Sequence, residues 1–379
     1  MTFKVRIESN ERNFTVLAGE SIIDAAVRQG VMLPYGCRNG MCGACKGRVV
    51  VGQVDYGTHS VYALSEQEKV AGLALFCQAK PLTDIVIEPR SVDITGQETV
   101  VKRLPCRVEK KERLAPDVMR LYLKLPNTER LQYVAGQYIN IILRDGRRRS
   151  FSISNALHTD VAVLAHRCAH RTWASCLAQV PFEAGSQTLP AAAIQAGLIE
   201  LHIAKVVDGE FTGHVFNGMK EKDILRIEGP LGDFTLRKDS TRPIIFLAAG
   251  TGFAPIKAII EAALAQGIQR PMYLYWGATT RAALYLDSVV REWVSEVENL
   301  VYVPVLSRPA PEDYWGGKQG YVQDTVVADF PDLRSFEIYA SGVPAMINAA
   351  RQMCLTHGLP LEYFYFDAFE FSGDIKSVD

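Results

Sequence analysis

The chain has 379 residues, a length that suits two or three domains. With 48% hydrophobic and 22% charged residues, it has the composition of a globular protein with buried cores. The formal net charge of −1 argues against a bulk attraction to nucleic acid or to an acidic membrane surface, and no apolar run reaches the roughly 18 residues of a spanning helix. Because the N-terminal stretch is charged and unlike a signal peptide, the eight cysteines favour a reducing cytoplasm.

The first 92 residues are predicted to form a small domain in which one helix crosses a mixed sheet. Alternating apolar residues predict strands at 3–8, 13–19, 47–55 and 84–89. A helix is predicted over 21–30, which Ser21 can cap and Gly30 can end, and a second over 64–72, where Ser65 and Glu68 form a capping box. The polar stretch 91–102 is predicted to be a linker.

Residues 103–238 and 239–379 are predicted to form two further domains of different architecture. Short strands separated by turn residues dominate 103–238, which indicates an antiparallel barrel. From residue 239 on, continuous apolar strands alternate with helices, as in the pair 243–250 and 254–267. This alternation is typical of a doubly wound parallel α/β sheet.

Four cysteines have the spacing of a plant-type two-iron cluster. Cys37, Cys42 and Cys45 follow the pattern C-x4-C-x2-C, and Cys77 supplies a fourth thiolate from a separate segment. Four glycines would let the chain wrap tightly around such a cluster: Gly36, Gly40, Gly43 and Gly47. A structural zinc site or inert thiols are the alternatives, but zinc sites usually show two paired C-x-x-C units.

The other cationic and thiol groups near this pattern have simpler interpretations. Arg38 and Lys46 could offset the negative charge of a cluster. Cys106 and Cys354 are predicted to be packed as small hydrophobic residues.

A second motif lies in the predicted barrel. The residues Arg149-Ser150-Phe151-Ser152 resemble the R-x-(Y/F)-S motif of the ferredoxin reductase superfamily. The resemblance implies that Arg149 pairs with a flavin pyrophosphate, that Phe151 covers part of the flavin, and that Ser152 bonds the isoalloxazine near N5. The alternative is an ordinary barrel strand with an exposed arginine. Further flavin contacts are expected from residues downstream: Lys205, Gly209 and Thr212.

A third motif opens the first helix of the predicted C-terminal domain. Gly250, Thr251 and Gly252 follow a buried strand and let the backbone approach a pyrophosphate at the helix N-terminus. Alone this is a weak signal, but the superfamily uses the same G-T-G-x-x-P form, which here ends at Pro255. In place of the superfamily's C-G-P-x-x-M segment, the chain has Ser341 and Gly342, so a hydroxyl stands where a thiol is common.

Over almost its whole length, the chain resembles one-component reductases of aromatic-ring oxygenases and the CDP-6-deoxy-glucoseen reductase type. The resemblance implies a plant-type ferredoxin domain (β-grasp), a flavin barrel and a nucleotide domain, in that order. It also implies a hydride transfer from NADH or NADPH to FAD, followed by single electrons through a 2Fe-2S cluster to a partner oxygenase or dehydratase. The expected catalytic residues are Ser152, Ser341 and Asp367, with Phe369 beside the flavin; the alternative for this last segment is a buried terminal strand.

One segment departs from the family pattern. Residues 161–196 form an alanine-rich insertion where a short connection between barrel strands is expected. It is interpreted as a helical excursion, as a poorly ordered insert, or as a zinc site built from His166, Cys168, His170 and Cys176. If it blocks the flavin site, the rival function is a non-enzymatic redox-sensing or assembly module.

Overall fold

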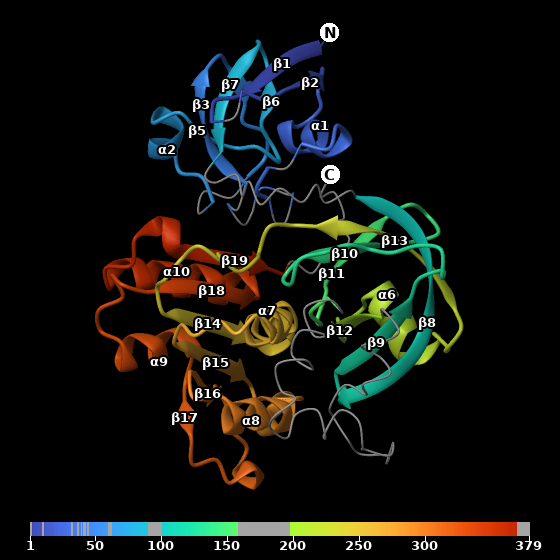
Figure 1. The fold of residues 1–379 in the computed structure, drawn as a ribbon, viewed down its shortest axis with the longest axis vertical. Coiled ribbons are helices and arrows are strands. Elements are labelled where there is room, and N and C mark those ends of the chain that lie inside the picture. Colours follow the sequence, from blue (N-terminus) through green and yellow to red (C-terminus); the bar gives the residue numbers. More distant parts are fainter. Residues whose placement is uncertain are drawn as a thin grey trace.

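The computed structural model describes residues 2–9, 11–31, 33–35, 38, 40, 43, 45–59, 63–89, 101–157 and 198–369. These residues form three domains, each built on a sheet of five or six strands (Figure 1). The linker predicted at 91–102 lies outside them except for its last two residues, and Lys102 already begins a strand. The insertion 161–196 lies wholly outside them, together with its candidate zinc ligands.

The N-terminal domain contains the predicted mixed sheet, with the strand order β2-β1-β7-β3-β5. Strand β1 pairs with β7 in parallel, whereas the other neighbours are antiparallel. The strands are β1 (Thr2–Ile7), β2 (Asn13–Leu17), β3 (Lys46–Val51), β5 (Leu73–Leu75) and β7 (Ile85–Pro89), and β4 (Val54–Asp55) pairs with β6 (Lys80–Pro81). The helices are α1 (Ile22–Arg28) and α2 (Glu66–Val70).

Both helices of this domain begin at the predicted caps. The Ser21 hydroxyl accepts a hydrogen bond from the Asp24 N–H at 3.1 Å, which satisfies one of the unpaired donors of the first turn of α1. Ser65 and Glu68 form the reciprocal capping box of α2. Because the first turn carries its own hydrogen-bond partners, these starts could be located from the sequence.

The middle domain is the predicted antiparallel barrel. Its strands are β8 (Lys102–Ala115), β9 (Val118–Lys124), β10 (Tyr138–Ile142), β11 (Arg148–Ser152), β12 (Ile199–Ala204) and β13 (Ile224–Leu231). They follow the order β11-β10-β13-β8-β9-β12, and an antiparallel bridge between Ile153 and Leu201 joins the two outer strands. The barrel therefore closes immediately after the R-x-(Y/F)-S motif.

A helix that the sequence analysis did not predict, α6 (Glu210–Asn217), follows β12. Its sequence, EFTGHVFN, includes a glycine and a threonine, which are poor helix formers. The helix buries Phe211, Val215 and Phe216 in the barrel core, so tertiary packing stabilises it rather than local propensity.

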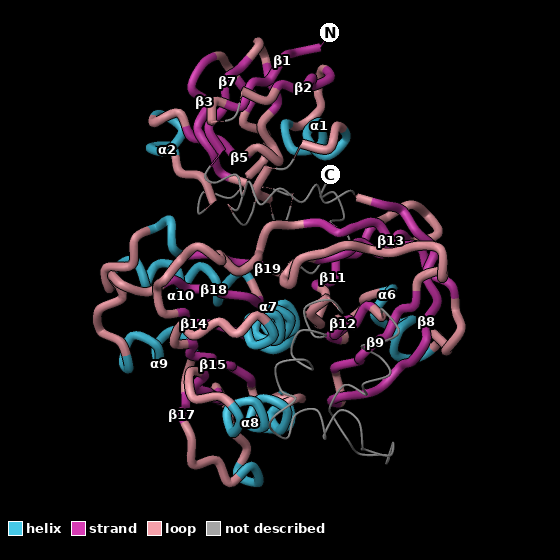
Figure 2. Tube along the Cα trace, viewed as in Figure 1, coloured by secondary structure: helices cyan, strands magenta, loops and turns pink. Residues whose placement is uncertain are grey.

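The C-terminal domain has a parallel sheet of strand order β17-β16-β15-β14-β18-β19 (Figure 2). Its strands are β14 (Ile244–Ala249), β15 (Met272–Ala278), β16 (Leu300–Leu306), β17 (Lys318–Gln319), β18 (Glu337–Gly342) and β19 (Phe364–Ala368). Its helices are α7 (Phe253–Ala265), α8 (Asp287–Glu296), α9 (Val322–Asp329) and α10 (Pro344–Thr356).

This domain is doubly wound, as predicted. Alternate residues of β14 enter two separate cores: Phe246 packs with residues of α7 and α8, and Leu247 packs with residues of α9 and α10. Helices therefore cover both faces of the sheet. Within the described part of the chain, no helix has the length and hydropathy needed to cross a membrane.

The barrel and the C-terminal domain meet closely at Gly136, which has φ +97°. A Cβ atom at this position would lie 1.8 Å from the Phe234 carbonyl oxygen and 2.9 Å from the Ile259 side chain of α7. Only glycine fits, both for its backbone conformation and for the space. The glycine thus lets α7 approach the barrel near the flavin motif.

Candidate cluster, flavin and nicotinamide sites

Two of the four predicted cluster ligands lie in the described part of the N-terminal domain, and the structure brings them together. Cys45 and Cys77 are both buried, and the Cys77 N–H donates to Cys45 Sγ at 3.5 Å. N–H groups directed at sulfur are what an anionic iron–sulfur cluster requires. Cys37 and Cys42 lie outside the described residues. The two described cysteines, Cys45 and Cys77, are placed as ligands of one cluster would be.

The two predicted counter-charges have carboxylate partners of their own. Arg38 pairs with Asp24, and Lys46 Nζ lies 2.5 Å from Glu68 Oε1. Each therefore offers less than a full positive charge to a cluster.

The two thiols predicted to be inert are buried. Burial raises the pKa of Cys106 and of Cys354 to about 12. Both thiols are therefore protonated at neutral pH, as expected for residues that pack rather than react.

The flavin motif lies on β11, where side chains alternate between the two faces. Arg149 and Phe151 share one face, and Ser150 and Ser152 share the other. The Phe151 ring lies 5.5 Å from the ring of Phe211 on α6, a contact that the sequence analysis missed together with that helix.

Three consecutive arginines precede the motif's aromatic residue, and their pairing differs. Arg147 pairs with Asp145 and Glu210, and Arg148 Nε lies 2.9 Å from Glu228. Among the described residues, Arg149 pairs with no carboxylate; its guanidinium donates only to the Arg148 carbonyl at 3.1 Å. Arg149 therefore retains a free charge, as a flavin pyrophosphate ligand should.

The remaining predicted flavin residues already have protein contacts. The Ser150 hydroxyl donates to Asn140 Oδ1 at 2.8 Å, and the Thr212 hydroxyl accepts from the Val206 N–H at 3.1 Å. Lys205 is exposed, with its ammonium group 5.9 Å from the centre of the Phe216 ring. Gly209 directly precedes α6, and a Cβ there would lie 2.5 Å from the Thr212 hydroxyl. Ser150 is thus bonded within the barrel sheet, whereas Lys205, Gly209 and Thr212 contact α6 or the loop before it.

The three predicted catalytic residues lie together at the junction of the barrel and the C-terminal domain. The Ser152 hydroxyl donates to Asp367 Oδ2 at 3.0 Å, across 215 positions of sequence. Asp367 lies on β19 directly opposite Ser341 on β18. The segment around Asp367 is therefore the last strand of the sheet, and Asp367 contacts the flavin motif through Ser152. Its place beside the flavin stays a prediction.

The Ser341 hydroxyl is fully buried and has no hydrogen-bond partner in the described protein. Leaving a buried hydroxyl unsatisfied costs about 1–3 kcal/mol. A ligand that bonds this hydroxyl would remove the cost, so the position fits a nicotinamide or flavin contact.

The predicted dinucleotide turn packs against the same point. Gly250 and Gly252 bound a 3-10 turn at the carboxyl end of β14, with Thr251 between them and Pro255 in the first turn of α7. A Cβ at Gly252 would lie 2.0 Å from the Ser341 carbonyl, whereas one at Gly250, where φ is +54°, would meet open space. The turn thus has room for a ligand on one side and none on the other.

Two further predicted residues complete this edge of the sheet. Gly342 has φ +148°, a conformation that favours glycine, and its carbonyl accepts the Phe369 N–H at 2.8 Å. Phe369 is half-buried. Both lie where ligands bind in open α/β sheets, at the carboxyl ends of the strands.

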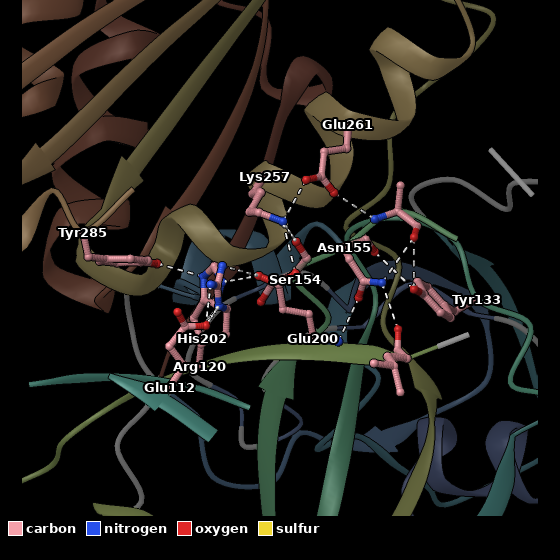
Figure 3. A network of polar contacts seen from close by, with 12 residues as sticks. Glu112, Arg120, Tyr133, Ser154, Asn155, Glu200, His202, Lys257, Glu261 and Tyr285 are labelled. Atoms are coloured by element: carbon pink, nitrogen blue, oxygen red, sulfur yellow. Dashed lines mark hydrogen bonds and ion pairs between the residues drawn. The ribbon is translucent and has the colours of Figure 1, made fainter. Parts of the chain in front are cut away.

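A buried ionic network, which the sequence analysis missed, lies beneath this junction (Figure 3). Its members come from the barrel and from the C-terminal domain: Glu112, Arg120, Glu200, His202, Lys257, Glu261 and Tyr285. A signal was present in the sequence, because Lys257 and Glu261 stand four residues apart in an otherwise apolar helix.

In this network the Glu200 carboxylate is ionised and the His202 ring is neutral at neutral pH. Burial would raise the pKa of Glu200, but Lys257, His202 and Arg120 outweigh burial and lower this pKa to about 2. Burial lowers the pKa of His202 to about 4 although Glu200 opposes it, so the ring is neutral. Neutral His202 can then donate through Nε2 to Glu200 at 2.8 Å and accept the Tyr285 hydroxyl at Nδ1 at 3.1 Å.

The N-terminal domain contacts the barrel on the other side of the flavin motif. Tyr138 of β10 lies directly opposite Ser152 and also belongs to the core that contains Cys45 and Cys77. The Tyr35 hydroxyl of the N-terminal domain bonds the backbone of Gly232 in the barrel. Tyr138 thus links the flavin strand with the core that contains Cys45 and Cys77.

Comparison with known proteins gives each domain a family. Residues 5–82 match the 2Fe-2S iron-sulfur cluster binding domain, residues 105–163 the oxidoreductase FAD-binding domain, and residues 246–352 the oxidoreductase NAD-binding domain.

Relatives match over the whole chain. The CDP-6-deoxy-L-threo-D-glycero-4-hexulose-3-dehydrase reductase of Yersinia pestis is 36% identical, over 97% of this chain and 99% of the relative. The terephthalate 1,2-dioxygenase reductase component 1 of Comamonas sp. is 30% identical, over 97% and 98%. The crystal structure of Amycolatopsis cytochrome P450 reductase GcoB has a TM-score of 0.71 at 29% identity and covers 97% of this chain and 98% of its own.

The fold and these matches define an iron–sulfur flavoprotein oxidoreductase dependent on NADH or NADPH. The chain belongs to the family of reductases that join a 2Fe-2S domain, an FAD domain and an NAD domain in one polypeptide, as the motifs predicted. The predicted cofactors are confirmed at the level of these domains.

Replacing Arg149 by alanine should lower FAD affinity roughly ten- to a hundredfold, because a charge-assisted phosphate contact contributes about 1.5–3 kcal/mol. Titration of flavin into apoprotein, followed by flavin fluorescence, would measure the change. Arg148→Ala is the matched control, since that arginine already pairs with Glu228. Equal losses in both variants would contradict a specific pyrophosphate role for Arg149.

Replacing Ser341 by alanine should separate stability from catalysis. Without cofactors, the variant should unfold at the same urea concentration as the parent or a higher one, because it loses an unsatisfied hydroxyl. With FAD bound, its flavin should be reduced by NADH more slowly in rapid-mixing absorbance. Ser295→Ala, on the exposed face of α8, is the control. A destabilised variant with an unchanged reduction rate would show that Ser341 is structural.

Proposed function

We propose that this reductase takes a hydride from NADH or NADPH and delivers single electrons to a separate oxygenase or dehydratase protein in the cytoplasm. When bound, FAD accepts the hydride and the two-iron cluster carries one electron at a time. The protein supplies binding, orientation and electrostatics, and no residue needs to act as a strong acid or base.

The observation that carries the proposal is the position of Ser152. This residue ends the flavin strand, donates to Asp367 of the NAD domain, and lies opposite Tyr138, which packs in the core of the 2Fe-2S domain. One serine therefore lies where all three domains meet. An electron carrier needs this proximity between its hydride-accepting site and its single-electron site.

The residues around Ser152 would bind different parts of the two cofactors. Arg149 would hold the flavin pyrophosphate and Phe151 would cover the ring. The turn from Gly250 to Gly252 would receive the dinucleotide pyrophosphate at the start of α7. Ser152, Asp367 and Ser341 would line the space in which the nicotinamide meets the flavin.

The acceptor is proposed from the names of the relatives. The Yersinia relative is the reductase of a CDP-hexulose dehydrase, and the Comamonas relative is a component of a dioxygenase. Both names describe a reductase that serves a second protein. Among the described residues no cysteine forms a disulfide, which suits a reducing compartment.

A non-enzymatic module that has lost its flavin is less well supported. In the described structure the Arg149 guanidinium lacks a carboxylate and the Ser341 hydroxyl lacks any hydrogen-bond partner. The unsatisfied Ser341 hydroxyl costs stability unless a ligand bonds it, which favours a protein that still binds its cofactors.

Replacing Cys77 by serine should abolish the cluster and spare the flavin reaction, because the cysteine belongs to a domain with its own sheet, separate from the flavin strand. NADH-to-ferricyanide reduction should persist, while NADH-to-cytochrome c reduction falls to near background. Cys106→Ser, at a buried barrel thiol, should keep both. If Cys77→Ser still reduced cytochrome c at the parental rate, electrons would not leave through the cluster.

A further inference from the structure

Lys257 is a buried lysine at the junction between the barrel and the NAD domain. It lies in α7, five positions beyond Gly252, and is 2% exposed. Burying an ammonium group is strongly unfavourable unless every proton finds a partner. Here all three do: Nζ lies 2.9 Å from the Ser154 carbonyl oxygen, 2.8 Å from Glu261 Oε1 and 3.4 Å from Glu200 Oε2.

These contacts join the helix of the dinucleotide turn to the end of the flavin strand. Ser154 stands two residues after Ser152, and its N–H donates to the Glu200 carbonyl at 2.8 Å where the barrel closes. One turn further along α7, Glu261 accepts the Ala156 N–H at 3.2 Å. Lys257 thus contacts the same end of the flavin strand from which Ser152 bonds Asp367.

Other members of the network hold Glu200 in place for Lys257. His202 donates to the Glu200 carboxylate from the same barrel strand, and Tyr285 of the NAD domain fixes the other nitrogen of that ring. Glu200 is fully buried, so its carboxylate cannot turn to solvent. The ammonium group is therefore held between two carboxylates and one backbone carbonyl.

Stability alone does not explain this network. A buried ion pair often contributes no more stability than well-packed apolar groups of the same size, whereas its directional bonds select one relative orientation. Orientation is what hydride transfer requires, because reacting atoms must come within about 3–3.5 Å and a 1 Å error can cost roughly a hundredfold in rate.

We propose that Lys257 is a positioning residue that fixes the NAD domain against the flavin strand, so that the nicotinamide and the flavin meet in one alignment. This inference rests on the function proposed above. Lys257 contacts the backbone next to the flavin motif and not the reacting atoms, so it acts through the placement of α7.

The test replaces the lysine together with Glu200, its fully buried carboxylate partner, while Glu261, whose side chain is 17% exposed, keeps the Ala156 N–H as a partner. Lys257→Met keeps the length of the side chain but strands Glu200, so the deciding variant is the double change Lys257→Met with Glu200→Gln. Lys318→Met is the matched control, because that lysine forms an exposed ion pair with Asp329 in the same domain. Anaerobic rapid mixing with NADH then gives the NADH dissociation constant and the limiting rate of flavin bleaching for each protein.

The double variant should bind FAD fully and bind NADH within about twofold of the parent. Its limiting rate should fall roughly ten- to a hundredfold. The long-wavelength charge-transfer absorbance of the nicotinamide–flavin pair should weaken, and the amides of Ser154 and Ala156 should exchange faster with deuterium before NADH is added. The control should match the parent in every measurement.

An unchanged limiting rate with an unchanged charge-transfer band would overturn the proposal. Loss of FAD from the double variant would also overturn it, because Lys257 would then support flavin binding rather than alignment. If the parent protein itself were not bleached by NADH, the proposed function would fail instead, and the two failures are therefore distinguishable.

Discussion

The contact between the Lys257 ammonium and the end of the flavin strand is the constraint on which the functional geometry depends. A lysine with almost no exposure is tolerated only because a backbone carbonyl and two carboxylates surround it. Those partners lie on both sides of the junction between the barrel and the NAD domain. The network therefore adds directional contacts to the apolar core that the barrel and the NAD domain share, and the proposed hydride-transfer site lies on the same junction.

The same logic extends to the N-terminal domain through a different kind of contact. There the barrel contributes Tyr138 and Leu231 to the core that contains Cys45 and Cys77, and the Tyr35 hydroxyl bonds the Gly232 backbone. Apolar packing is less directional than hydrogen bonding to a buried charge, and single-electron transfer tolerates more variation in geometry than hydride transfer. The directional ion-pair contacts thus lie at the junction between the barrel and the NAD domain, where hydride transfer needs the more exact geometry.

Features held by contacts between near neighbours in the sequence could be predicted, whereas features held by contacts between distant residues could not. The caps at Ser21 and Ser65 bond neighbours three residues away, so they could be predicted. The candidate site was outlined because glycines and an arginine have fixed roles beside phosphates and thiolates. The bond from Ser152 to Asp367 spans the barrel and the NAD domain, and no local pattern announces it.

Helix α6 and the buried network were missed for the same reason. The helix depends on burying Phe211 and Val215 in a core assembled from other strands, against its own poor propensity. In the sequence Lys257 is a charged residue in a largely apolar helix, and only the fold places Glu200 beside it. The roles of Ser150 and Thr212 were also incompletely predicted, since both hydroxyls are engaged within the barrel.

An anaerobic titration with NADH, followed by absorbance and electron spin resonance together, tests most directly whether one chain carries electrons from the nicotinamide to the cluster. The flavin should bleach and the signal of a reduced two-iron cluster should appear, with about one and a half equivalents of NADH filling two flavin electrons and one cluster electron. A flavin that bleaches completely while the cluster signal never appears would contradict this route.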